Sequence, residues 1–189
     1  METSSGNSGW ALWGRYVVLC VLGLAVGWAV LVPARSFKKN NADKSKSVAL
    51  MVANVLKAYR SEYGRFPPGL GETTAAETGG ALVAALSGAD TTDNSQGVNF
   101  LPELRPLAPG EPGGPGLRRN AAGESVVDAW GRRLHVLVDA DGDGFIPNPE
   151  PRAPQSRVEA SVLVWSGGPD GDPTTWKDNV ATWRARSLR

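Results

Sequence analysis

The chain has 189 residues, a formal net charge of +1 and a single cysteine, Cys20. This length suits one globular domain beside a separate segment, and the near-zero charge excludes a bulk electrostatic attraction to nucleic acid. A lone cysteine excludes an intramolecular disulfide bond, so it carries no information on the redox compartment.

The first feature along the chain is an apolar segment from Trp10 to Val32, which only Arg15 interrupts. Residues 16–32 carry no charge, and the whole run is long enough to cross a hydrocarbon core of about 30 Å. A cleaved signal peptide would have a shorter apolar region and a small-x-small cleavage site. We therefore expect an N-terminal tail and a retained transmembrane helix within residues 1–35.

A second helix is predicted over residues 44–63, because apolar residues recur there at the spacing of one helical face. Gly64 ends this pattern, and Pro67 and Pro68 prevent its return. The transmembrane and amphipathic segments form either one long rod or two separate helices. The apolar face consists of Val48, Met51, Val52, Val55, Leu56, Tyr59 and Tyr63.

The strand signals come late in the chain. Apolar residues alternate over 134–138 and again over 158–164, which predicts two strands with one buried face each. Residues 80–88 predict a short helix, and 89–125 predict mostly loop. The expected fold class is α+β: a long N-terminal transmembrane-plus-amphipathic helix packed on a small antiparallel β-sheet. The head would cover residues 36–189, with its sheet in residues 126–189.

The sharpest local motif follows the first predicted strand and has the spacing of a twelve-residue calcium loop. Acidic residues stand at its first, third, fifth and twelfth positions, and a glycine at its sixth permits the sharp turn. A strand before the loop and several prolines after it do not fit an EF-hand, so a bare Asp-Gly turn remains the alternative. The predicted ligands are Asp139, Asp141, Asp143 and Glu150.

A second acidic loop follows the second predicted strand. It contains hard oxygen ligands that would suit Ca²⁺ together with backbone carbonyls, although the spacing alone also fits a glycine- and proline-rich turn. The candidate ligands in this loop are Asp170, Asp172, Asp178 and Asn179.

No pattern of an enzyme accompanies these loops. The only histidine, His135, falls within a predicted strand and has no cysteine near it in sequence. The sequence also lacks a Walker-type phosphate loop. We therefore expect a protein without catalytic activity or a small-molecule substrate.

Several segments in this order resemble the major pseudopilin of type II secretion, a member of the type IV pilin-like family. They are Leu31-Val-Pro-Ala34, the helix end Leu56-Lys-Ala-Tyr-Arg-Ser-Glu-Tyr-Gly-Arg-Phe-Pro67, the turn Asp128-Ala-Trp-Gly131, and Val164-Trp-Ser-Gly-Gly-Pro-Asp-Gly171 with Asp178-Asn-Val-Ala-Thr-Trp183. The resemblance implies a pilin-like fold and a structural subunit. Its partners would be membrane lipid and other pilin-like subunits or secretion-system components. It also implies Ca²⁺ in the loop after the last strand, at Asp170, Asp178 and Asn179.

The N-terminus departs from this family. Gly14 is followed by Arg15-Tyr-Val-Val-Leu19, whereas the family has a glutamate at the fifth position after its processed glycine. A tethered binding module that does not polymerise is therefore the alternative function. The family places the head outside the cytoplasm, on a single-pass inner-membrane anchor, but the positive-inside rule favours the opposite orientation. The basic residues after the span are Arg35, Lys38, Lys39, Lys44 and Lys46.

Overall fold

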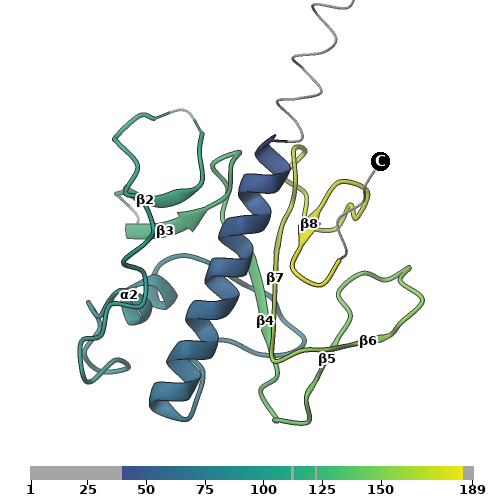
Figure 1. Cartoon of the computed structure of the whole chain (residues 1–189), viewed down its shortest axis with the longest axis horizontal. Helices are drawn as coiled ribbons and strands as arrows, with labels where there is room; N and C mark the ends of the chain where they lie inside the picture. The colour runs from purple at the N-terminus through teal and green to yellow at the C-terminus, as the bar shows by residue number, and fades with distance from the viewer. Residues whose placement is uncertain (1–39, 112, 122, 185–189) are drawn as a thin grey trace, which may run out of the picture. The chain divides into compact units, whose positions relative to one another are not determined.

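The longest described element is a helix over residues 40–63 (Figure 1). The computed structural model describes residues 40–111, 113–121 and 123–184. The helix ends at Gly64, which takes a left-handed φ of 69° and donates its N–H to the carbonyl oxygen of Arg60 at 2.8 Å. Glycine is favoured at such an end because it adopts this conformation without steric cost.

One face of this helix is buried, and it includes two alanines outside the predicted stripe. Ala49 and Ala53 are buried together with Val48, Val52, Leu56 and Tyr59. Met51 and Val55, which belong to the predicted stripe, are only partly buried at its edge. The buried face is thus shifted around the helix toward its alanines, whose small side chains allow close packing.

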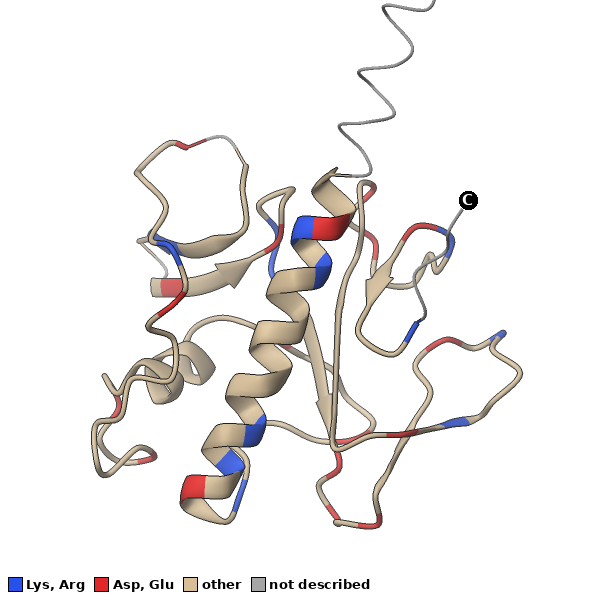
Figure 2. Cartoon of the chain, viewed as in Figure 1, with Lys and Arg blue, Asp and Glu red and all other residues tan. Residues whose placement is uncertain are grey.

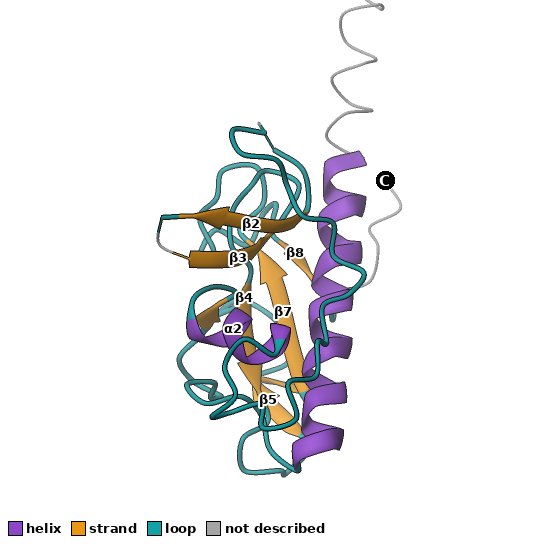
Figure 3. Ribbon diagram, turned by 90° about the vertical axis from the view of Figure 1, so that its left-hand side faces the viewer, coloured by secondary structure: helices purple, strands orange, loops and turns teal. Residues whose placement is uncertain are grey.

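Four strands form the main sheet, in the order β1-β4-β7-β8, and all neighbouring pairs are antiparallel. The register of β4 and β7 runs from His135 opposite Trp165 to Val138 opposite Val162. Figure 3 shows the helix lying along one face of this sheet. The strands are β1 (Ala76–Glu77), β4 (His135–Val138), β7 (Val162–Ser166) and β8 (Val180–Ala181).

Two hairpins and a short helix complete the described elements. The hairpins pair β2 (Gly116–Asn120) with β3 (Gly123–Val127) and β5 (Phe145–Pro147) with β6 (Arg157–Glu159). The short helix α2 (Ala81–Ser87) ends at Gly88, which is again left-handed, and it confirms the predicted helix at 80–88. The β2–β3 hairpin, in contrast, occupies part of the stretch expected to be loop. The single strand expected over 158–164 is divided between β6 and β7, which belong to different sheets.

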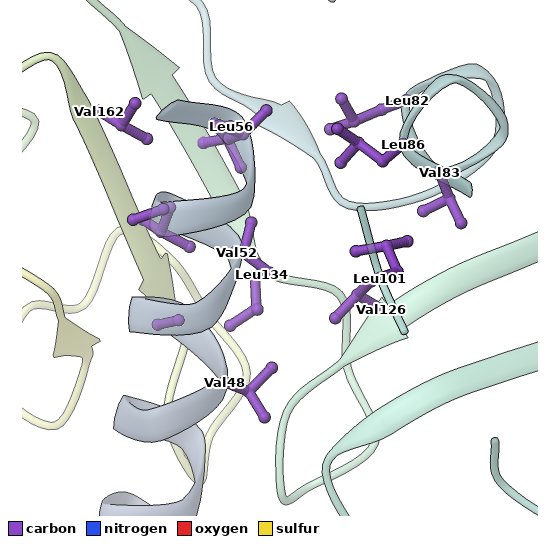
Figure 4. Close-up of a cluster of buried hydrophobic side chains, with 14 of the residues drawn as sticks. Val48, Val52, Leu56, Leu82, Val83, Leu86, Leu101, Val126, Leu134 and Val162 are labelled. Atoms are coloured by element: carbon purple, nitrogen blue, oxygen red, sulfur yellow. The ribbon is translucent and has the colours of Figure 1, made fainter. Parts of the chain in front are cut away.

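The helix, the main sheet and α2 share one hydrophobic core (Figure 4). A second, smaller cluster lies on the other face of the sheet, because β4 and β7 alternate their side chains between the two faces. Both faces of the sheet are therefore covered, which the alternating sequence pattern did not predict. The first core includes Val48, Val52, Leu56, Leu82, Val83, Leu86, Leu101, Val126, Leu134 and Val162. The second consists of Leu137, Ile146, Leu163, Trp165 and Ala181.

The predicted fold class is wrong in its leading element and in its sheet. In the part of the chain that the structure describes, neither helix is long and apolar enough to cross a membrane. The helix over 40–63 is amphipathic, with charged residues at both ends of the span. The predicted transmembrane segment lies in residues 1–39, outside the described residues. In place of one sheet over 126–189, three separate sheets form, and strands from as early as Ala76 contribute to them.

Candidate metal centre

The first acidic loop closes on itself through the carboxylate of Asp139. This residue directly follows β4 and is 3% exposed. Its Oδ1 accepts the N–H of Gly142 at 2.9 Å, and its Oδ2 accepts the N–H of Gly144 at 3.3 Å. Asp141 Oδ1 accepts the N–H of Asp143 at 3.0 Å. These bonds make the segment a tight turn between β4 and β5.

Two of the four predicted ligands in this loop are engaged by arginines. Asp143 pairs with Arg157, and the hydrogen bond from that guanidinium is the main reason that the pKa of Asp143 lies below its usual value. Glu150 pairs with Arg184, whose Nε donates to Oε2 at 3.0 Å. The structure therefore does not bring all four acids of the predicted twelve-residue calcium loop together, since Asp143 and Glu150 lie outside the acidic group that includes Asp139 and Asp141.

Glu72 joins this loop from 68 residues earlier in the chain. Its Oε1 accepts the N–H groups of Ala140 and Asp141 at 3.0 and 2.9 Å. Among the described residues, Glu72, Asp139 and Asp141 are the acidic group close enough for a shared cation, with ligand atoms within 4.8 Å of one another. Four of their six carboxylate oxygens accept backbone N–H groups, and Arg60 Nη1 lies 3.7 Å from Asp139 Oδ2. Protein donors thus already stabilise this acidic turn.

The second acidic loop divides its predicted ligands into two pairs. The first pair is exposed and satisfied locally: Asp170 accepts the Thr175 hydroxyl and the N–H of Asp172, which lowers the pKa of Asp170. Asp172 accepts the hydroxyl and the N–H of Thr174, with the same effect on its own pKa. These two carboxylates serve the turn in which they lie.

The second pair, Asp178 and Asn179, has unused oxygens. Asp178 Oδ1 and Asn179 Oδ1 are both buried and have no hydrogen-bond partner among the described residues. Asn179 is 6% exposed, and its Nδ2 donates to the carbonyl oxygen of Pro173 at 2.9 Å, which fixes the orientation of the amide. Buried polar atoms without partners are rare in folded proteins, and a bound water or ion is one way in which such atoms are satisfied.

Gly168 allows the start of the loop to pass close to this pair. It adopts a φ of 69°, and a Cβ at this position would lie 2.5 Å from the carbonyl oxygen of Asp178. A side chain at position 168 would therefore force the two strands of the loop apart. Asp178 and Asn179 supply carboxylate and amide oxygens, which are among the ligand types that Ca²⁺ prefers.

The turn at Asp128 holds the beginning of the same loop. Asp128 is fully buried, and its Oδ1 accepts the N–H groups of Trp130 and Arg132 at 2.9 and 3.0 Å. Its Oδ2 accepts the hydroxyl of Ser166, which in turn accepts the N–H of Gly168 at 3.0 Å. The sequence predicted only a turn before the sheet at this position, because the partners in the loop lie 38 residues away.

The guanidinium of Arg132 holds the loop from the same turn. Its Nη1 donates to the carbonyl oxygens of Gly168 and Pro169 at 2.8 and 3.0 Å. Gly171 lies against this guanidinium, and a Cβ there would come within 2.4 Å of it. The start of the acidic loop is therefore fixed by two residues of the Asp128 turn.

His135 of β4 lies beside this region and stacks on the indole of Trp165, with 5.3 Å between ring centroids. Burial lowers the pKa of His135 below the usual 6.5, although the negative charges of Glu77 and Asp128 oppose this shift. As the pH falls below 6.5, the unfolded chain therefore takes up this proton before the folded chain does. The free energy of unfolding must then decrease as the pH falls.

We expect the wild-type melting temperature to fall between pH 7.5 and pH 5.5 by more than that of His135→Phe. Phenylalanine preserves the aromatic contact with Trp165 but does not titrate. The measurement is thermal unfolding of both proteins across this pH range. Equal losses in the two proteins would show that His135 does not cause the pH dependence.

Comparison of the chain with known protein families, with characterised proteins and with solved structures gave no match.

Proposed function

We propose that the chain is a non-catalytic, membrane-anchored structural subunit, similar in role to the major pseudopilin of type II secretion, with a head stabilised by Ca²⁺. Residues 16–32 would form a single-pass anchor in the inner membrane, with the head outside the cytoplasm. Its partners would be membrane lipid and other subunits of a secretion or pilus-like assembly. The observation that carries this proposal is the uncharged surface that residues 47–56 of the helix present to solvent.

This surface is uncharged and partly apolar, because solvent reaches Leu50 as well as the polar residues Ser47 and Asn54. Residues 47–56 include no charged side chain, and Leu50 is 43% exposed. Figure 2 shows charged residues only toward the two ends of the helix. A groove of about 600 Å³ lies beside this surface, lined by Leu50, Met51, Val55, Phe100, Leu101 and Pro102 among others. Apolar surfaces of this kind typically mark contacts between proteins.

A second copy of the chain is the occupant that best matches this surface. Among the described residues, Glu103 is the only charged one that lines the groove, so a strongly charged partner would gain little there and would lose hydration. Two copies of this surface can pack against each other without bringing like charges together. Lateral contact between these helices would thus assemble subunits without any covalent step.

The unpaired oxygens of Asp178 and Asn179 support the second part of the proposal. They lie in the loop that the pseudopilin resemblance assigns to Ca²⁺, and they are the hard oxygen ligands of that loop that remain unbonded in the described chain. A weakly held Ca²⁺ in such a site requires the millimolar concentrations found outside cells. This requirement favours a head outside the cytoplasm.

Replacement of Leu50 by aspartate tests the assembly surface. We expect Leu50→Asp to remove crosslinked oligomers of the full-length chain in membranes, because a charge would then be buried in each apolar contact. The stability of the head should change little, because Leu50 is exposed. Crosslinking followed by gel analysis measures the oligomers.

Ser61→Asp is the matched control, since it places the same charge on an exposed position of the same helix outside the groove. It should leave the oligomers intact. Recovery of only monomeric wild-type protein, with no pilus or secretion partner attached, would contradict the proposal.

Mass analysis of the mature N-terminus separates this function from a tethered binding module. The module is favoured by the absence of a glutamate five positions after Gly14. A methylated N-terminal residue that follows a glycine in the sequence would indicate processing for assembly. An intact Met1 would favour the module that does not polymerise.

A further inference from the structure

Lys46 joins the helix to the C-terminal end of the described chain. Its ammonium group donates to the carbonyl oxygens of Ala181, Thr182 and Arg184, the last two at 3.1 and 3.0 Å. A lysine ammonium carries three N–H donors, so these three carbonyls match its full donor capacity. A single side chain of the helix therefore holds the backbone of residues 181–184, which lie 135 to 138 residues away in sequence.

The fixed segment begins directly after the candidate calcium ligands. Asp178 and Asn179 precede β8, which is only two residues long and pairs with β7 at Trp165 and Ser166. Thr182 extends this pairing, because its N–H donates to the carbonyl of Val164 at 2.9 Å and its hydroxyl accepts the N–H of Val164 at 3.2 Å. So short a strand contributes few ladder bonds, and the contacts of Lys46 add to those of Arg184 with Glu150 and with the carbonyl oxygen of Trp176 in holding residues 178–184 closed.

The closed position of this segment also has a cost. It buries Asp178 Oδ1 and Asn179 Oδ1 without hydrogen bonds, and such burial opposes folding because both oxygens lose their contacts with water. A cation bound to these oxygens would remove that cost. Lys46 and the cation would therefore stabilise the same closed conformation from its two ends.

We propose that Lys46 is a positioning residue for calcium binding, which couples occupation of the Asp178–Asn179 site to docking of residues 180–184 on the helix. This inference rests on the proposed calcium-binding function. If the site binds only when the segment is closed, the apparent affinity is reduced by the fraction of molecules that are open. Loss of the Lys46 contacts must then weaken Ca²⁺ binding, and Ca²⁺ must in turn hold the segment on the helix.

The test is calorimetric titration of the full-length chain in detergent with Ca²⁺, together with hydrogen exchange of the amides in residues 176–184. We expect Lys46→Met to weaken Ca²⁺ binding by about tenfold, within the usual range of coupling between sites. In the wild type, Ca²⁺ should slow exchange in residues 180–184. Lys46→Arg retains a cationic donor and should recover most of the affinity, whereas a purely structural role would lower stability without changing the affinity of the folded protein.

Lys57→Met serves as the matched control, because it removes the same charge from an exposed position of the same helix. Thr182→Val provides an independent variant: it removes the hydroxyl that bonds to Val164 without touching Lys46, and it should also weaken Ca²⁺ binding. If the wild type binds Ca²⁺ and Lys46→Met binds it equally well, the coupling is refuted while the calcium site stands. If the wild type does not bind Ca²⁺, both the site and the coupling are refuted.

Discussion

The Asp128→Ala variant is expected to lose about 2–4 kcal/mol of the free energy of unfolding, the range for breaking a buried hydrogen-bond network. Asp128 is fully buried and accepts three donors: the N–H groups of Trp130 and Arg132 and the hydroxyl of Ser166. Alanine would leave these donors without their partner. Because Ser166 also bonds to Gly168, the start of the second acidic loop should loosen as well. Denaturant unfolding measures the loss.

Asp172→Ala is the matched control for this prediction. Asp172 also accepts hydrogen bonds within a turn, from the N–H and hydroxyl of Thr174. It is exposed, however, so water replaces the lost partners and the variant should remain close to the wild type in stability. Equal losses in Asp128→Ala and Asp172→Ala would mean that the buried network has no special role.

Ca²⁺ at a hundredfold excess over its dissociation constant should stabilise the wild-type head by about 2.7 kcal/mol, as ligand linkage requires. For a folded unit of this size, that corresponds to a rise in melting temperature of about 5–10 °C. Asp178→Ala should abolish the rise, because it removes one of the two unpaired oxygens. Asp139→Ala should preserve the rise, although it lowers the baseline stability by removing the acceptor of the Gly142 and Gly144 N–H groups.

The behaviour without Ca²⁺ makes this prediction more specific. In the presence of a chelator, Asp178→Ala should be no less stable than the wild type, since the variant no longer buries an unsatisfied oxygen. The measurement is the melting temperature of the wild type, Asp178→Ala and Asp139→Ala, each with and without millimolar Ca²⁺. Loss of the rise in Asp139→Ala but not in Asp178→Ala would move the metal site to the first acidic loop. If Ca²⁺ raises the melting temperature of none of these proteins, the proposed metal binding is refuted.

Parts of this structure follow from short-range patterns. The apolar spacing over 48–63 predicts the helix, and Gly64 with the prolines after it predicts its end. The glycines at 80 and 88 similarly enclose α2. The alternation over 134–138 predicts β4, but the same alternation over 158–164 does not reveal that β6 and β7 belong to different sheets. A strand pattern specifies which residues share a face, and it does not specify which strand will pair with it.

The candidate site shows the same division between local and distant information. The chain by itself determined that two loops contain hard oxygen ligands at close spacing, because the acids and glycines of a tight turn are neighbours in sequence. Only the tertiary structure decided which of these oxygens remain unused. Arg157 and Arg184 engage Asp143 and Glu150, whereas Asp178 and Asn179 are left buried without partners.

The long-range contacts that organise these loops are visible only in the tertiary structure. Glu72 reaches the first loop across 68 residues, Asp128 reaches the second across 38, and Lys46 reaches its far end across 135. The local sequence around each indicates at most a turn or a helix, and it does not indicate the distant partner. Turn and helix geometry is encoded within a few residues, but a charge or hydrogen bond is satisfied by whichever partner the completed fold brings near.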